Sequence, residues 1–303
     1  GTTSYMDMPN VLPPTLTQDL WEKKNNMASI NSYANYSFYM GTSNDNIEVI
    51  KALNPNKVCG VKIFMGSSTG NLLVDNEKSL ENIFKESPVI ITTHCEDSNI
   101  IQENEKKFID TYGEDLPFSY HTEIRNRESC IKSTTYAINL AKRFNSQLHV
   151  LHISTKDELD FFKSGPVDKK NITAEVCIPH LFFSSKDYES QGPLIKCNPS
   201  IKHTSDQLAL IEALKEERID FVATDHAPHT MEEKQQIYKL CPAGMPSIQF
   251  TLLVVIDLVE KNVLSLEEVP KITAHNVASR FKIKERGFIR EGYWADLVLV
   301  DRK

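Results

Sequence analysis

The chain has 303 residues, 40% of them hydrophobic and 25% charged, which is the balance of a globular protein rather than a disordered or fibrous one. Its 34 basic and 41 acidic residues give a net charge of −7, which argues against a nucleic-acid-binding surface. It says little about a small-molecule substrate that is itself an anion.

Cysteine usage and apolar runs bear on the compartment. The six cysteines include no Cys-x-x-Cys pair, which favours reduced thiols in the cytoplasm over disulfides or a structural zinc site. The most apolar stretch, residues 250–259, is too short to cross a membrane and is predicted to be a core helix. No signal peptide is recognisable, and we expect residues to be missing before Gly1. The sequence leaves open whether the chain forms a homo-oligomer.

Strand-like and helix-like segments alternate along the chain. The predicted strands cover residues 3–8, 36–40, 58–65, 89–93, 147–153, 172–178 and 219–224. The predicted amphipathic helices cover residues 16–33, 43–53, 78–85, 127–144, 156–163 and 205–217. This alternation predicts a parallel sheet with helices outside it, and seven strands are one short of a closed (β/α)₈ barrel.

The C-terminal part has a different pattern. Residues 264–278 are predicted to be helical, with a Ser265-x-x-Glu268 capping box near their start. Residues 287–301 have the pattern of a turn followed by a strand of a small appended β-unit. We therefore expect a barrel domain over residues 1–286 and a segment of a small β-domain over residues 287–303.

The most informative segment is residues 223–229, Ala-Thr-Asp-His-Ala-Pro-His, which follows a predicted strand. In α/β barrels the catalytic groups gather at the C-terminal ends of the strands. Asp225 lies at such an end, although a helix N-cap or a loop ion pair would explain a single aspartate equally well. Metal-capable residues on three other strands favour a functional site.

These three residues are Lys62, His94 and His152. Lys62 lies within an apolar run, where an unpaired ammonium group is costly to bury. His94 directly follows one predicted strand, and His152 lies at the end of another. A single buried histidine is more often a packing residue than a ligand. Ligand-type residues from several strand ends, converging with an aspartate, are much less easily explained by packing.

Strand alternation separates the remaining histidines. His149 lies three residues before His152, so we expect it to face outward beneath a helix while His152 faces the barrel. By the same parity, His226 faces away from Asp225 and is expected to have a supporting role. Imidazole and carboxylate ligands suit zinc with an open position for water. This predicts metal-assisted hydrolysis, with Asp225 binding metal and accepting the proton from water.

The candidate ligands resemble the strand-four lysine, strand-five and strand-six histidines and strand-eight aspartate of the amidohydrolase superfamily: Lys62, His94, His152 and Asp225. The resemblance implies an α/β, TIM-type (β/α)₈ barrel of the metal-dependent hydrolase kind. It also implies that Lys62 is carboxylated on its amine and bridges two zinc ions. His94 and His152 would hold the more exposed ion.

Within this superfamily the chain resembles the dihydroorotases that are related to hydantoinases and allantoinases. The resemblance is carried by residues 7–10, Asp-Met-Pro-Asn, residues 94–97, His-Cys-Glu-Asp, residues 196–199, Lys-Cys-Asn-Pro, and residues 223–229. It implies that the following residues bind substrate: Asn10, Asn198, His229, Ala243 and Gly244. From the residues alone, the two asparagines would be assigned to turns, because each lies near a proline.

The chain departs from the family pattern at strand one. The family has a His-x-His pair there, whereas this chain has no histidine before His94. Its first predicted strand corresponds to strand two of the family, so the missing ligands and the missing eighth strand have the same cause. The implied function is zinc-dependent, reversible hydrolysis of dihydroorotate to N-carbamoyl-aspartate in pyrimidine biosynthesis. Two alternatives stay open, namely a hydantoinase- or allantoinase-type cyclic amidohydrolase and a catalytically silent relative that acts as a scaffold. The charged residues 230–240 are expected to form a mobile loop.

Overall fold

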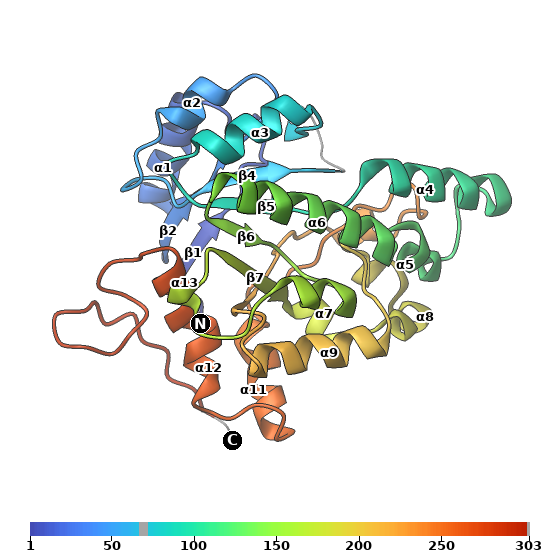
Figure 1. Cartoon of the computed structure of the whole chain (residues 1–303). Coiled ribbons are helices and arrows are strands. Elements are labelled where there is room, and N and C mark those ends of the chain that lie inside the picture. The colour runs from blue at the N-terminus through green and yellow to red at the C-terminus, as the bar shows by residue number, and fades with distance from the viewer. Residues whose placement is uncertain (67–71, 302–303) are drawn as a thin grey trace.

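The computed structural model describes residues 1–66 and 72–301. In these residues parallel strands follow one another in chain order and helices flank them (Figure 1). The strands are β1 (Ser4–Asp7), β2 (Asn35–Phe38), β3 (Met40–Gly41), β4 (Val61–Phe64), β5 (Ile91–His94), β6 (Leu148–Val150), β7 (Ile172–Cys177) and β8 (Phe221–Ala223). Every predicted strand up to residue 224 therefore overlaps an observed one.

The strands are arranged in two parallel sheets that share one extended segment. β1 pairs with β2, and β3 to β8 pair in sequential order. Only Tyr39 separates β2 from β3. Its N–H donates to Asp7 O at 3.1 Å, and the next N–H, that of Met40, donates to Gly60 O at 3.0 Å. The predicted strand 36–40 thus joins the first sheet to the second, giving the strand sequence of an α/β barrel.

Helices connect successive strands. They are α1 (Gln18–Asn31), α2 (Ile47–Lys51), α3 (Glu77–Glu86), α4 (Ser98–Tyr112), α5 (His121–Ile124), α6 (Arg127–Phe144), α7 (Ile178–Phe182), α8 (Tyr188–Gln191), α9 (Thr204–Lys215), α10 (Met231–Lys234), α11 (Thr251–Glu260), α12 (Glu268–Pro270) and α13 (Asn276–Arg280). Helix α3 packs against α2 and α6, as expected for helices that succeed one another around a sheet. Side-chain caps fix several of their starts, as where Asn126 accepts the N–H of Ser129 at 3.0 Å to begin α6.

The two faces of the six-stranded sheet differ in chemistry. On the face toward the helices, strand residues such as Val61, Ile63 and Val150 belong to the main hydrophobic core. The opposite face is polar, because the strand register aligns Lys62, Thr92, His149 and Thr173 in one row. All four of these side chains are buried. These four side chains therefore face the interior of the barrel.

This row shows that the prediction for His149 is wrong. His149 does not lie beneath an outer helix: its Nδ1 and Nε2 bond Thr173 Oγ1 at 2.9 Å and Glu175 Oε2 at 3.0 Å, on the polar face of β7. Alternation fails between positions 149 and 152 because β6 ends at Val150 and His152 has a left-handed φ of 38°. The side chains of both histidines therefore lie inside the barrel.

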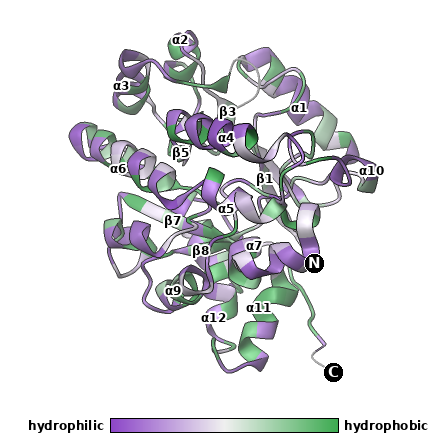
Figure 2. Ribbon diagram, turned by 90° about the vertical axis from the view of Figure 1, so that its right-hand side faces the viewer, coloured by the Kyte–Doolittle hydropathy of each residue, from purple (hydrophilic) through white to green (hydrophobic). Residues whose placement is uncertain are grey.

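The C-terminal helices form near their predicted positions, although the helix predicted from residue 264 begins at Glu268. Helix α11 buries Val255, Leu258 and Val259, and Figure 2 shows it mainly in the green of hydrophobic residues. The predicted helix 264–278 forms as α12, a π-helical turn over Lys271–His275, and α13. None of the described helices has the length and apolar character that a membrane span requires.

The strand predicted within residues 287–301 is wrong. In this part of the described chain the segment has turns but no strand, and Leu297 and Leu299 are exposed. A strand needs a neighbour for its ladder of hydrogen bonds, and none pairs with this segment in the described residues. The division of the chain at residue 287 stays a prediction.

Candidate active site

Lys62 is a buried amine without an ionic partner. Its side chain projects from β4 and the residue is only 3% exposed. Nζ lies 4.5 Å from the centroid of the Phe64 ring, and no hydrogen bond or ion pair joins Nζ to any other described residue. Burial lowers the pKa of Lys62 to about 8, against the opposing effect of the negative charge of Asp225. In a fraction of the molecules Lys62 is therefore the neutral amine near neutral pH.

His94 and His152 come together from neighbouring strands. His94 Nδ1 and His152 Nε2 are 2.9 Å apart, and the two rings meet edge to face. Each residue is 5% exposed, and burial lowers the pKa of both imidazoles. Neutral imidazole is the form that binds a metal ion. The structure thus confirms that these two predicted ligands are neighbours.

Two of the predicted ligands lie at strained positions of the backbone. His152, just beyond β6, has a φ of 38°, and Asp225, just beyond β8, has a φ of 44°. A left-handed conformation is unfavourable for residues with a side chain and tends to occur at functional sites. At His152 this conformation accompanies a break in the alternation of the preceding strand, because His149 and His152 both contact polar groups inside the barrel.

Asp225 combines solvent access with an elevated basicity. The residue is exposed, yet many protein atoms surround its carboxyl group. Burial raises the pKa of Asp225 to about 6, the nearby Lys62 opposes the rise, and the charges of Glu175 and Glu96 add to it. Solvent access moderates the rise, which leaves a more basic carboxylate within reach of water.

The candidate ligands suit a metal ion by their chemistry, although they form only a partial set. In residues 1–66 and 72–301 no group of three or more His, Cys, Asp or Glu side chains is close enough to hold an ion. His94 Nδ1 and His152 Nε2 do face one another, on neutral rings that can bind a metal ion. The amine of Lys62 and the carboxylate of Asp225 lie near enough to influence each other's charge. Nitrogen and carboxylate donors are those that zinc prefers.

A buried carboxylate that was not predicted from the sequence orients His94. Nε2 of His94 bonds Glu96 Oε2 at 2.9 Å, and the fully buried Glu96 accepts from Arg125 Nε at 3.1 Å and Nη2 at 2.5 Å. Burial alone would raise the pKa of Glu96, but the charge of Arg125 and the bond to His94 hold it well below its usual range. Glu96 is part of the His-Cys-Glu-Asp motif, whereas nothing local in the sequence indicates Arg125.

Several predicted substrate contacts form a second cluster. The N–H of Gly244 donates to Lys196 O at 2.8 Å, close to Asn198 in the chain. Gly244 has a φ of 142°, and a Cβ there would lie 2.5 Å from Ala227 O and 3.2 Å from His229 Cδ2. The segments of Asn198, His229 and Ala243–Gly244 are thus adjacent.

Asn10 and His226 have different surroundings. Asn10 is exposed in the loop after β1, and no described contact joins it to the other candidates. His226 accepts the backbone N–H of Ile248 through Nδ1 at 3.2 Å and bridges Met245 through its backbone. These contacts connect His226 to residues 245–248, and its supporting role stays a prediction.

The segment 230–240 is anchored rather than free. Lys234, at the end of α10, is buried, and its Nζ donates to the carbonyl groups of Lys196, Pro242 and Gly244 at 3.0 to 3.2 Å. Tyr238 is also buried. These contacts contradict the expected mobility, because the buried ammonium group connects the segment to the backbone of the substrate cluster.

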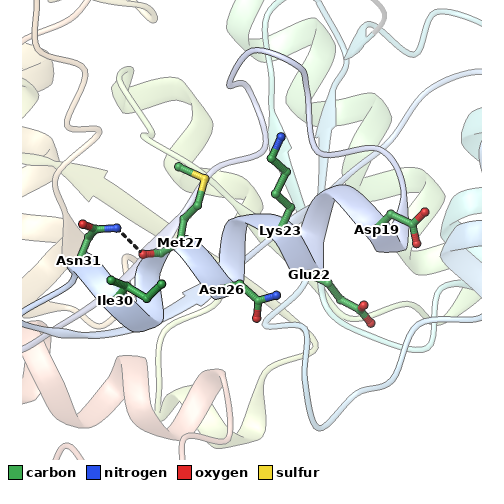
Figure 3. A pocket seen from close by; sticks show the side chains of 7 residues that line it. All are labelled: Asp19, Glu22, Lys23, Asn26, Met27, Ile30 and Asn31. Atoms are coloured by element: carbon green, nitrogen blue, oxygen red, sulfur yellow. Dashed lines mark hydrogen bonds between the residues drawn. The ribbon is translucent and has the colours of Figure 1, made fainter.

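A surface hollow of about 490 Å³ lies elsewhere, along α1 (Figure 3). It is lined by Asp19, Glu22, Lys23, Asn26, Met27, Ile30 and Asn31. All of these side chains come from one helix, and none of the strand-end candidates contributes to the hollow. We therefore place the site at the strand ends.

Comparison with known proteins finds relatives that align with the whole chain. No family model matches the chain. A dihydroorotase of Methanosphaera stadtmanae is 31% identical over 308 aligned residues, which cover 100% of this chain and 68% of that protein. An allantoinase of Bacillus velezensis is 29% identical, covering 99% of this chain and 67% of the relative. The chain thus spans about two thirds of the length of these relatives.

A solved structure gives the same result for the fold. The L-hydantoinase (dihydropyrimidinase) of Arthrobacter aurescens matches with a TM-score of 0.89 at 23% identity, over 97% of this chain and 66% of that one. The match confirms the predicted fold, an α/β barrel. With the sequence identity to curated relatives, the chain therefore belongs to the dihydroorotase family of cyclic amidohydrolases.

Proposed function

We propose that the protein is a dihydroorotase, which reversibly hydrolyses the ring amide of dihydroorotate to N-carbamoyl-aspartate in pyrimidine biosynthesis. The observation that carries the proposal is the contact between His94 and His152, with the charge of Lys62 felt at both imidazoles and that of Asp225 felt at Lys62, in a chain 31% identical to a dihydroorotase. The proposal concerns the full-length protein, acting in the cytoplasm on a small molecule.

Two zinc ions are part of the proposal. Lys62 would hold both as a carbamate, His94 and His152 would bind one, and Asp225 would bind the other. The neutral amine is the form of lysine that adds to CO₂, with a new N–C bond and release of one proton. When bound, zinc acidifies a water molecule and polarises a carbonyl group.

Asp225 is proposed to move the proton. Its basic carboxylate accepts a proton from the attacking water, then donates it to the ring nitrogen as the amide C–N bond breaks. Asn198, His229 and the backbone amides of Ala243 and Gly244 are proposed to hold the amide and carboxylate edges of the substrate. Their adjacency around Gly244 supports this role.

The decisive variant is Asp225→Asn in the full-length protein. Asparagine retains the size of aspartate and tolerates a left-handed φ, but it accepts no proton at neutral pH. We expect kcat to fall at least about 10²-fold, the usual contribution of a general base. Asp257→Asn, which removes only an exposed ion pair to Lys261, is the control and should keep full activity. Near-full turnover of Asp225→Asn with metal still bound would reject the assigned role.

The allantoinase relative makes other cyclic amides the second candidate. Turnover of dihydroorotate, hydantoin and allantoin by the full-length protein separates the two activities. Preference for allantoin or hydantoin would replace the main proposal. Metal analysis of freshly purified protein tests the third option, because absence of both bound zinc and turnover indicates a silent scaffold.

A further inference from the structure

His121 connects three distant stretches of the chain. It begins α5 and is only 2% exposed. Its Nδ1 lies 2.8 Å from Tyr238 Oη, and its Nε2 lies 2.9 Å from Cys197 O and 3.2 Å from Asn198 Oδ1. The imidazole thus links the anchored segment 230–240 to an asparagine of the substrate cluster.

The partners of His121 determine which of its nitrogens carries the proton. A carbonyl oxygen can only accept, so Nε2 must donate to Cys197 O. Burial, together with the positive charges of Arg125 and Lys196, lowers the pKa of His121 to about 3, so the ring is neutral and has a single proton. Nδ1 is therefore unprotonated and accepts from the hydroxyl group of Tyr238.

The tautomer in turn determines the orientation of the Asn198 amide. The atom beside a donating Nε2–H must be an acceptor, so it is Oδ1 of Asn198 rather than Nδ2. Nδ2 donates to no other group among the described residues, and the residue is only partly buried. Two N–H groups of Asn198 are therefore available to a ligand.

We propose that His121 is a positioning residue that fixes Asn198 with its N–H groups toward the substrate, where they meet a carbonyl or carboxylate oxygen. This inference rests on the proposed function for the identity of the substrate, but its geometry does not. A substrate N–H at this position would meet a donor and be disfavoured. The orientation thus selects how an acidic cyclic amide lies in the site.

A double-mutant cycle tests this coupling in the full-length protein. His121→Phe removes the Nε2–H donor and frees the amide to rotate, so we expect the KM for dihydroorotate to rise about tenfold with a smaller change in kcat. In the Asn198→Ala background, His121→Phe should raise KM no further. A rise of the same size in both backgrounds would overturn the inference, because it would indicate a merely structural role.

Two tyrosine variants give a matched comparison that preserves the histidine. Tyr238→Phe removes the hydroxyl that bonds His121. Tyr188 is also buried, and its ring packs edge-on against His121 with the ring centroids 6.2 Å apart. Its hydroxyl accepts from the N–H of Ile201 and does not bond His121, so Tyr188→Phe is the control. We expect only Tyr238→Phe to raise KM and to shift the ring ¹⁵N resonances of His121. Equal effects of the two variants would contradict the proposal.

The ¹⁵N spectrum also separates this inference from the proposed function. In the unaltered protein His121 should give the pattern of an imidazole with its proton on Nε2 across neutral pH. A proton on Nδ1 would reject the inference whatever the activity. If the protein does not turn over dihydroorotate but shows the Nε2–H pattern, the proposed function fails while the geometric reading is upheld.

Discussion

The pair of Arg125 and Glu96 offers a quantitative test of how the site is built. Arg125→Met keeps most of the side-chain volume but leaves the fully buried Glu96 carboxylate with His94 as its one side-chain partner among residues 1–66 and 72–301. Removing one member of a buried ion pair typically costs about 3–5 kcal/mol. Because the bond to His94 remains, we expect the lower end of this range, about 3 kcal/mol at pH 8.

The loss should depend on pH in a defined direction. In the unaltered protein the pKa of Glu96 is depressed, so its contribution to stability is present above the unfolded pKa of about 4.5 and lost as pH falls below it. In the variant, burial without Arg125 raises that pKa. Its penalty is therefore largest at high pH and diminishes as the carboxyl takes up a proton. The difference between the two proteins should be clearly smaller at pH 5 than at pH 8.

Urea unfolding at the two pH values measures both quantities. Arg143→Met, which removes an exposed ion pair with Glu81, is the matched control and should cost less than about 1 kcal/mol. Replacing Glu96 by leucine in the Arg125→Met background should restore part of the stability, because no buried charge is then left. A cost below about 1 kcal/mol at pH 8, or an equal cost at both pH values, would refute the reasoning.

Three further predictions concern the site and its surroundings. Gly244→Ala should lose more stability than Gly165→Ala and should raise KM. Both glycines have a positive φ, but only at Gly244 would an added Cβ clash with its neighbours. Urea unfolding and steady-state kinetics measure the two effects. His121→Gln should weaken the loss of stability between pH 6.5 and 4, since a histidine with a lowered pKa is protonated more readily in the unfolded chain; an unchanged pH profile would contradict this. Lys62→Gln should reduce bound zinc in elemental analysis, whereas Lys261→Gln should not.

The positions of the strands and of the principal ligands were predictable because their signals are local. Apolar runs indicated β4, β5 and β8. The structure places Lys62 within β4, His94 at the end of β5 and Asp225 just beyond β8. The polar interior of the barrel was not predicted. His149 was assigned to the wrong face because alternation holds only within a paired strand, and β6 ends two residues before His152.

The supporting residues were beyond local reasoning. Arg125 lies 29 residues from Glu96, and His121 lies 117 residues from Tyr238. Both occur at a short helix, without a periodic pattern or motif that would connect them to a strand end. Their roles depend on burial and on hydrogen bonds that only the folded chain creates. The strand predicted in residues 287–301 failed for a related reason, since pairing depends on a partner and not on the segment alone.

The left-handed backbone at His152 and Asp225 lowers the stability of the fold at the positions where the proposed ligands are needed. Glycine would adopt the observed φ of 38° and 44° without strain, so at the exposed position the variant Asp225→Gly should match or exceed the parent in stability, by up to about 1 kcal/mol. His152→Gly relieves the same strain but also loses the buried imidazole that bonds His94. Each would remove a proposed ligand in the same step. Selection for stability alone therefore favours an inactive chain, and a relative that loses its activity by this route gains robustness from the change.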